Sequence, residues 1–215
     1  MELSRPMRVV TAALDGDLLA VLAGADHAFT GRQLARLAGA SSEGARRALA
    51  RLVEQGIVLR EPAGAAQMYR LNREHLAATA VLALAHLRFA LLDRLRGVLG
   101  SWERAPAYAA LFGSAARGAE RADSDLDILV VRPDDLATDD PRWRAQIADL
   151  ERDVARWTGN DTRVLELGVA DAASLHGESV IDDVLRDGIP LAGDVAALRQ
   201  LRPPRRRTRS LPSVR

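Results

Sequence analysis

The sequence predicts an α+β protein of two domains joined by a long helix. Residues 1–72 hold three stretches with apolar residues at helical spacing, followed by two short runs typical of strands. Residues 73–104 carry one continuous apolar stripe of helical period. Residues 105–201 alternate strands and helices, which predicts a mixed sheet with helices packed against it.

The composition narrows the class of protein. The chain of 215 residues has no cysteine, which excludes disulfides and thiolate metal sites, and all of its 30 basic residues are arginine. The start, MELSRPMRVV, lacks the apolar region of a signal peptide, and the longest apolar stretch, residues 77–87, is too short to span a bilayer. We expect a cytoplasmic protein with no membrane partner.

Charge is distributed unevenly along the chain. Residues 103–194 contain 20 acids and 10 arginines, whereas the remainder contains 9 acids and 20 arginines. An acidic segment does not follow a nucleic-acid backbone well without metal ions. The two parts of the chain are therefore expected to meet different partners.

The first unit reads as three helices and a hairpin. Residues 15–24 form the first predicted helix, and Thr30 is expected to cap a second that runs to Leu37. Ser41 or Ser42 caps the third, whose buried face is Ala45, Ala48, Leu49 and Leu52. Gly56 ends that helix, and residues 57–60 and 67–71 form the two strands of the hairpin.

This order, and the text FTGRQLARLAGASSEGARRALARLVEQGIVLRE, resembles the winged helix-turn-helix domains of bacterial transcription regulators. In that family the third helix enters the major groove and the hairpin flanks it. The resemblance implies a DNA partner, and the residues expected to contact DNA are Ser42, Arg46, Arg47, Arg51, Arg60 and Arg70. The alternative is a unit used for protein contact, since residues 1–72 hold 9 arginines against 7 acids.

A linking helix is predicted over residues 73–104, with Asn72 as its cap and an apolar stripe from Leu76 to Val98. The stripe either pairs with a second copy in a homodimer or packs on the C-terminal domain.

The most informative stretch is residues 111–131, LFGSAARGAERADSDLDILVV, which reads as strand, glycine turn, loop and strand. Side chains alternate along a strand, so Asp125 and Asp127 point the same way. Two adjacent carboxylates are costly to bury without a cation, and Mg²⁺ prefers carboxylate and phosphate oxygens. The Gly113–Ser114 turn offers backbone N–H groups and a hydroxyl to a phosphate.

Ten residues separate Ser114 from Asp125. This G-S, ten-residue, D-x-D pattern resembles the nucleotidyltransferase motif of the DNA polymerase beta superfamily, in particular the minimal nucleotidyltransferases. The resemblance implies ATP or another NTP as substrate and two Mg²⁺ ions. It implies nucleotide contacts at Gly113, Ser114, Arg117, Gly118 and Ser124. Arg117 either stabilises charge on the nucleotide or ties the loop to the protein.

The superfamily requires a third carboxylate on a neighbouring strand. On the strand predicted for residues 162–168, Leu165 and Leu167 share one face and Glu166 lies on the other. If the leucines face the helices, as Leu126 and Ile128 are expected to, Glu166 joins Asp125 and Asp127 as a catalytic metal ligand. Asp161 is the alternative ligand, in the preceding turn.

The rest of the C-terminal domain is predicted as a helix from Pro141, a helix over residues 179–187, a strand over residues 189–191 and a last helix over residues 194–201. Residues 202–215 hold six arginines, three prolines and no acid, which predicts a disordered tail. The tail either contacts nucleic acid or covers the acidic domain.

These features together predict a Mg²⁺-dependent nucleotidyltransferase coupled to a DNA-binding regulatory domain. The expected reaction is adenylyl transfer from ATP to a hydroxyl of a protein or other acceptor. Small members of the superfamily act as antitoxins that adenylylate a toxin, so an antitoxin-like role is implied by the resemblance. The alternative is a transcription regulator whose transferase domain only senses nucleotide, which a missing third carboxylate would favour.

Overall fold

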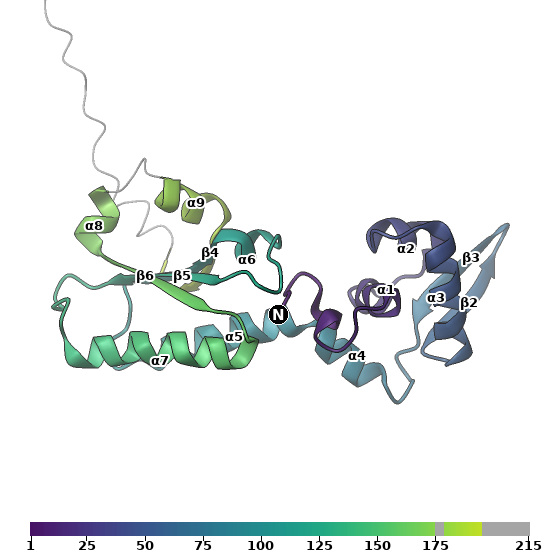
Figure 1. The fold of residues 1–215 in the computed structure, drawn as a ribbon, viewed down its shortest axis with the longest axis horizontal. Coiled ribbons are helices and arrows are strands. Elements are labelled where there is room, and N and C mark those ends of the chain that lie inside the picture. Colours follow the sequence, from purple (N-terminus) through teal and green to yellow (C-terminus); the bar gives the residue numbers. More distant parts are fainter. Residues whose placement is uncertain (175–178, 195–215) are drawn as a thin grey trace, which may run out of the picture. The chain divides into compact units, whose positions relative to one another are not determined.

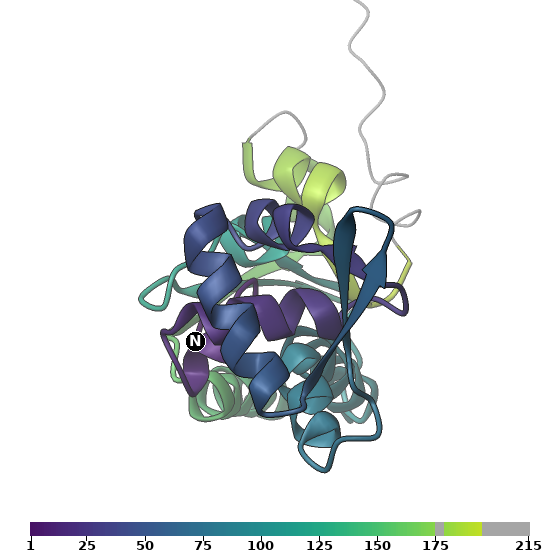
Figure 2. The same ribbon diagram turned by 90° about the vertical axis from the view of Figure 1, so that its right-hand side faces the viewer.

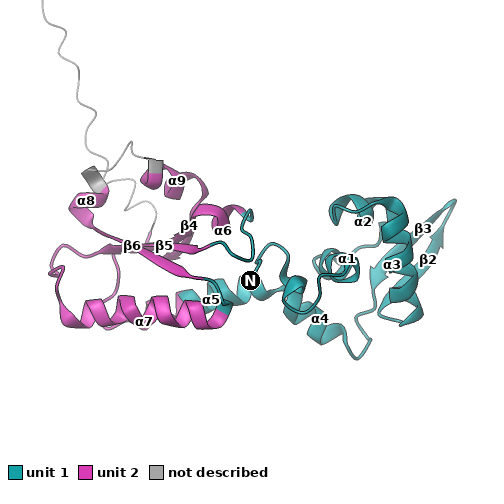
Figure 3. Cartoon of the chain, in the orientation of Figure 1, with its two compact units in different colours: residues 1–95, 118–124, 158–160 teal, residues 96–117, 125–157, 161–215 magenta. Residues whose placement is uncertain are grey.

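The computed structural model describes residues 1–174 and 179–194. The chain divides into two compact units (Figure 3). The N-terminal unit comprises Met1–Leu95, Gly118–Ser124 and Thr158–Asn160. The C-terminal unit comprises Arg96–Arg117, Asp125–Trp157 and the described residues from Asp161 onward.

The N-terminal unit is a helical cluster with a three-stranded antiparallel sheet of order β1-β3-β2 (Figure 1). Its elements are η1 (Pro6–Val9), α1 (Leu14–Ala23), β1 (Phe29–Thr30), α2 (Gly31–Leu37), α3 (Ser42–Glu54), β2 (Val58–Ala63), β3 (Ala66–Leu71) and α4 (Ala78–Ala85). The buried leucines of α1, α2 and α3 share one apolar core with β2 and β3.

Predicted helix ends in this unit are confirmed by their hydrogen bonds. Thr30 and Gln33 form a capping box at the start of α2. The Ser41 hydroxyl accepts the Gly44 N–H at 3.1 Å and caps α3. Gly56 follows α3 with a φ of 77°, the left-handed conformation that ends many helices. Figure 2 turns α3 and the β2–β3 hairpin toward the viewer.

The prediction of one linking helix was wrong. The apolar stripe is divided between α4 and α5 (Leu87–Gly100), with a turn at His86. Asn72 does not cap α4: its amide donates to the Gly56 carbonyl at 2.9 Å and its Oδ1 accepts the Glu74 N–H at 3.2 Å. The Asn72 side chain is thus bonded to Gly56 and to the turn that follows β3, and α4 starts only after Ala77.

The C-terminal unit has a four-stranded sheet of order β6-β5-β4-β7, and the prediction of a mixed sheet is confirmed. Strands β5 and β6 are parallel, whereas β4 is antiparallel to both β5 and β7. The elements are β4 (Tyr108–Phe112), α6 (Gly113–Arg117), β5 (Leu126–Arg132), α7 (Pro141–Thr158), β6 (Thr162–Gly168), α8 (Val169–Ser174), α9 (Ser179–Asp187) and β7 (Ile189–Ala192). The predicted last helix beyond Asp194 and the tail lie outside the described residues.

The two faces of this sheet pack against different helices (Figure 1). On one face, Leu129 and Val131 of β5 form a core with Ile181 and Val184 of α9. The opposite face packs on α7, whose Glu151 accepts the Val164 N–H at 3.1 Å. Each strand residue therefore belongs to an α8–α9 face or to an α7 face. No helix in the described part of the chain is both long and apolar enough to cross a membrane.

Candidate functional site

An acid pair lies at the start of the central strand β5. Asp125 directly precedes the strand and Asp127 is its second residue, so both carboxylates are on the α8–α9 face with Leu129 and Val131. In the antiparallel pairing with β4, Asp127 stands opposite Phe112, the residue before Gly113. The strand pairing thus brings the glycine turn to the acid pair.

Gly113 is required by the position of the Asp127 carboxylate. A Cβ at position 113 would lie 2.5 Å from Asp127 Oδ2. Gly113 also has a φ of 72°, a backbone conformation that residues with a side chain rarely adopt. Helix α6 starts at this residue, so Ser114 directly follows the glycine that lies against Asp127. The structure therefore brings together Gly113, Asp125 and Asp127 as the motif predicted.

We expect Gly113→Ala to disturb this arrangement. The added methyl must displace the Asp127 carboxylate, and the positive φ costs about 1–2 kcal/mol for a residue with a Cβ. The expected result is a lower free energy of unfolding together with weaker binding of Mg²⁺ and nucleotide, measured by urea denaturation and calorimetry. Gly97→Ala is the control, because nothing lies within 4 Å of a Cβ built there. Unchanged binding by Gly113→Ala would contradict the proposed role of the close approach.

The electrostatics of the pair favour a bound cation. The pKa of Asp127 is raised above its usual value, first by burial and then by the neighbouring charge of Asp125. Arg163 of β6 opposes this effect, and its Nη2 lies 2.7 Å from Asp125 Oδ2. Repulsion between the carboxylates is thus only partly relieved by the protein itself.

This donor set fits one divalent cation. Two carboxylates on one face supply the hard oxygen ligands that Mg²⁺ takes, and Gly113 has no Cβ to displace the Asp127 carboxylate. Among residues 1–174 and 179–194, no group of three or more His, Cys, Asp or Glu side chains is placed to hold a metal ion. The described residues therefore do not supply the third ligand of the two-ion site expected from the sequence.

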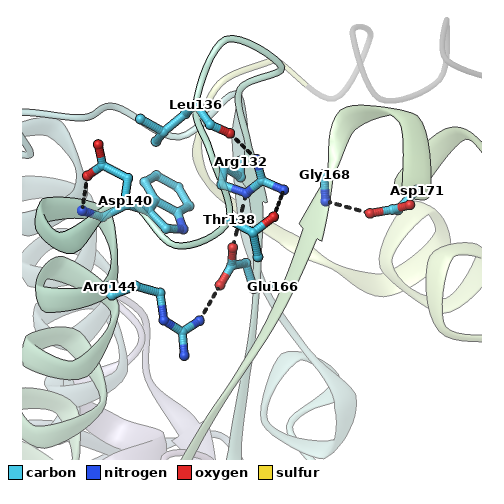
Figure 4. Close-up of polar contacts among 9 residues, drawn as sticks. Arg132, Leu136, Thr138, Asp140, Arg144, Glu166, Gly168 and Asp171 are labelled. Carbon is cyan, nitrogen blue, oxygen red and sulfur yellow. Dashed lines mark hydrogen bonds and ion pairs between the residues drawn. The ribbon is translucent and has the colours of Figure 1, made fainter.

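Glu166 was the predicted third ligand, and its predicted position was wrong. Its Oε1 accepts from Arg132 Nε at 3.2 Å and its Oε2 from Arg144 Nη1 at 2.9 Å (Figure 4). Arg132 also donates to Thr138 Oγ1 at 2.9 Å and to the Leu136 carbonyl. Glu166 therefore fastens β5, α7 and the loop after β5 on the α7 face, away from Asp127.

Register explains the error. In the parallel pairing, Glu166 lies beside Val130, whereas Leu165 lies beside Leu129 and Leu167 beside Val131. Neighbours in register share a face, so the leucines of β6 join the Asp127 face and Glu166 joins the other. The residue of β6 beside Asp127 is Arg163. Asp161, the alternative ligand, precedes β6, and its carbonyl accepts the Leu126 N–H at 2.8 Å.

The comparisons with known proteins agree with the motif. Residues 92–165 match the model of the nucleotidyltransferase domain family. This part of the chain is a nucleotidyltransferase domain. Enzymes of this family generally use an NTP and a divalent metal ion. No curated protein matches the chain.

Two solved structures are distantly similar. One is a crystal structure of a toxin–antitoxin with AMP-PNP, at 20% identity and a TM-score of 0.36. The other is a crystal structure of a mutant of the toxin–antitoxin MntA-HpeT, at 17% identity and a TM-score of 0.35. Each likeness covers 51% of this chain and 79% of the other. Likenesses this remote assign neither a fold nor a partner.

The other motif residues of the nucleotidyltransferase domain have separate positions. Arg117 ends α6 and its Nη1 lies 3.9 Å from Asp187 Oδ2 of α9, which favours a tie between helices over a free charge. Gly118 and Ser124 belong to the loop grouped with the N-terminal unit. Gly118 has a φ of 67°, and Ser124 Oγ accepts the Arg121 N–H at 2.9 Å. Sequence reasoning missed Arg163, because only the register reveals its place beside Asp127.

The residues predicted to contact DNA lie on α3 and on the hairpin of the N-terminal unit. Several of their arginines are paired with acids on the surface. Arg46 and Arg47 lie 2.8 Å and 3.6 Å from Glu43, and Arg70 lies 3.0 Å from Glu61. Arg51 pairs with Asp15, whereas Ser42 opens α3 and Arg60 is exposed on β2. Exposed pairs of this kind contribute about 0–1 kcal/mol each, so a phosphate can replace the acid.

Proposed function

We propose that the protein transfers a nucleotidyl group from an NTP, in the first instance ATP, to a hydroxyl of an acceptor. The observation that carries this proposal is the acid pair packed against the Gly113 backbone at the end of β4. The match of residues 92–165 to the nucleotidyltransferase domain family supports the proposal. Asp125 and Asp127 are the proposed catalytic residues.

Each residue of the site has a separate task in this proposal. Asp125 and Asp127 would hold one Mg²⁺, which would supply positive charge to the triphosphate and to the leaving pyrophosphate. The Gly113 and Ser114 backbone N–H groups, with the Ser114 hydroxyl, donate hydrogen bonds to phosphate oxygens. Arg117, tied to Asp187, keeps α6 against α9.

The reaction balances without a further reactant. The acceptor oxygen forms a bond to the α-phosphorus, and the bond from that phosphorus to the bridging oxygen of the β-phosphate breaks. Pyrophosphate leaves with the electron pair of that bond. The hydroxyl proton passes to water.

The proposed acceptor is a hydroxyl of a protein, in an antitoxin-like role. The test is transfer of label from α-³²P-ATP to the protein itself and to proteins encoded beside its gene, analysed on denaturing gels. Covalent label that requires Mg²⁺ and is lost in Asp127→Asn supports the proposal. Nucleotide binding with no transfer to any of these proteins would contradict it and indicate a regulator that senses nucleotide.

We further propose that the N-terminal unit is a winged helix-turn-helix that binds DNA, in a cytoplasmic homodimer. Support comes from the order of three helices and a hairpin, with arginines on the outer side of α3 and on the hairpin. Nucleotide binding or transfer by the nucleotidyltransferase domain would then change the affinity of the same chain for DNA.

We expect Arg46→Ala with Arg47→Ala to weaken binding to the upstream DNA of the gene by about tenfold or more, because each arginine supplies a phosphate or base contact worth about 1 kcal/mol or more. Affinity of the unaltered protein should fall steeply with salt, since bound counterions are released. Fluorescence anisotropy measures both effects. Arg156→Ala on α7 is the control, as an exposed arginine paired with Asp153 at 3.0 Å. Binding that ignores salt, or no binding, would assign the unit to protein contact.

A further inference from the structure

Arg163 occupies the position where a second metal site would need an acid. In the parallel pairing of β5 and β6 it is the neighbour of Asp127, on the same face of the sheet. Its guanidinium lies 2.7 Å from Asp125 and its side chain is 73% exposed, whereas the Asp125 side chain is 26% exposed. The arginine thus contacts the acid pair at Asp125 while most of its side chain stays exposed.

Other residues of β6 leave no replacement on this face. Leu165 and Leu167 follow Arg163 at every second position and are packed in the apolar core with α8 and α9. Glu166 is on the α7 face and is held by two arginines. Within the residues that the structure describes, two carboxylates are the full acidic donor set of the site. They can hold one Mg²⁺ but give a second ion too few ligands.

The guanidinium of Arg163 supplies positive charge beside the acid pair, as a second metal ion would, but it binds phosphate through hydrogen bonds. A guanidinium is always protonated and binds phosphate oxygens through two parallel N–H donors. Without nucleotide, Arg163 neutralises Asp125. When a cation binds the Asp125 carboxylate, the exposed Arg163 guanidinium loses its ion-pair partner. It then lies close enough to the cation site to bind a phosphate there.

We propose that Arg163 replaces the second divalent cation of this site: the centre takes one Mg²⁺ on Asp125 and Asp127, and Arg163 binds the triphosphate. This inference rests on the proposed function and names how its site recognises the nucleotide. Arg163 competes with the metal for Asp125 when nucleotide is absent and cooperates with it when nucleotide is present. Removing the arginine therefore has opposite effects on the two ligands.

The first test measures Mn²⁺ as a stand-in for Mg²⁺ by electron paramagnetic resonance. Arg163→Gln should bind Mn²⁺ alone several-fold more tightly than the unaltered protein. It should bind α,β-methylene ATP with Mn²⁺ about tenfold more weakly, since one charge-assisted phosphate contact is lost. Arg152→Gln, an exposed arginine paired with an acid on α7, should change neither value. A purely structural role of Arg163 would not move the two affinities in opposite directions.

The second test counts ions. With saturating α,β-methylene ATP the protein should bind one Mn²⁺ for each bound nucleotide, and Arg163→Asp should bind two. Two ions in the unaltered protein, or an unweakened analogue affinity in Arg163→Gln, overturns the inference alone. Absence of any Mn²⁺-dependent analogue binding, or its retention in Asp125→Asn with Asp127→Asn, overturns the proposed function as well. Circular dichroism checks that each variant is folded, and if Arg163→Asp is not, the ion count and affinities of Arg163→Gln decide.

Discussion

Asp127→Asn is expected to remove nucleotidyl transfer almost completely while leaving the protein folded. The substitution keeps the size of the side chain beside Gly113 but takes away one of two carboxylates on the proposed Mg²⁺ site. Loss of a ligand from a metal that stabilises the transition state costs several kcal/mol, or roughly a thousandfold in rate. Single-turnover transfer from labelled ATP measures the effect.

The same substitution should stabilise the fold at neutral pH. Burial and Asp125 raise the pKa of Asp127 in the folded protein, so the ionised form is less favourable there than in the unfolded chain. Stability linked to this group is fully present below the unfolded pKa and is lost as the pH rises through the folded pKa. An asparagine side chain at this position cannot ionise and avoids that loss, with a gain in Tm of about 2–4 °C for each kcal/mol. The gain should vanish toward low pH, where the carboxyl group of Asp127 is protonated in both states.

Activity and stability moving in opposite directions separates this prediction from unfolding. Asp135→Asn, at an exposed acid in the loop after β5, is the matched control and should change neither quantity. A variant Asp127→Asn that transfers at the normal rate would show that Asp127 is no metal ligand. A variant that melts at lower temperature at pH 7 would contradict the electrostatic account.

Local chemistry allowed much of the fold to be predicted. Thr30, Ser41 and Gly56 mark helix ends because their side chains or their left-handed backbone satisfy the terminal groups. Pro141 begins α7 for a related reason, since the first helical residue needs no N–H. The alternation of Thr162–Gly168 indicated the limits of β6 as the structure has them.

The failures concern relations between elements. Alternation within one strand says which residues share a face, but it does not say which face is shared with the next strand. That depends on register, and a register different by one residue exchanges the faces of Glu166 and Arg163. The continuous apolar stripe likewise did not reveal the turn at His86 between α4 and α5. Apolar residues keep the same helical spacing on both sides of that residue. The acid pair was predictable, since its members are two residues apart at the start of one strand.

A strongly destabilising effect is expected for Glu166→Gln, with little change in transfer. Glu166 binds Arg132, whose side chain is only 13% exposed, and Arg144 of α7. The glutamine side chain keeps one acceptor oxygen but has no negative charge. The largely buried Arg132 guanidinium then has only neutral partners, which include the Leu136 carbonyl and the Thr138 hydroxyl. Removing one member of a mostly buried pair costs about 1–3 kcal/mol or more.

Urea denaturation of the C-terminal unit and single-turnover transfer together test this expectation. Glu103→Gln is the matched control, because Glu103 pairs with Arg142 on the surface, where the side chains are 60% and 64% exposed, and it should cost at most about 1 kcal/mol. The rate of Glu166→Gln should stay within about twofold at a temperature where the variant is folded, since Glu166 contacts neither Asp125 nor Asp127 in the register of the sheet. A thousandfold loss of rate without loss of stability would return Glu166 to the metal site and require β6 to shift by one residue when nucleotide binds.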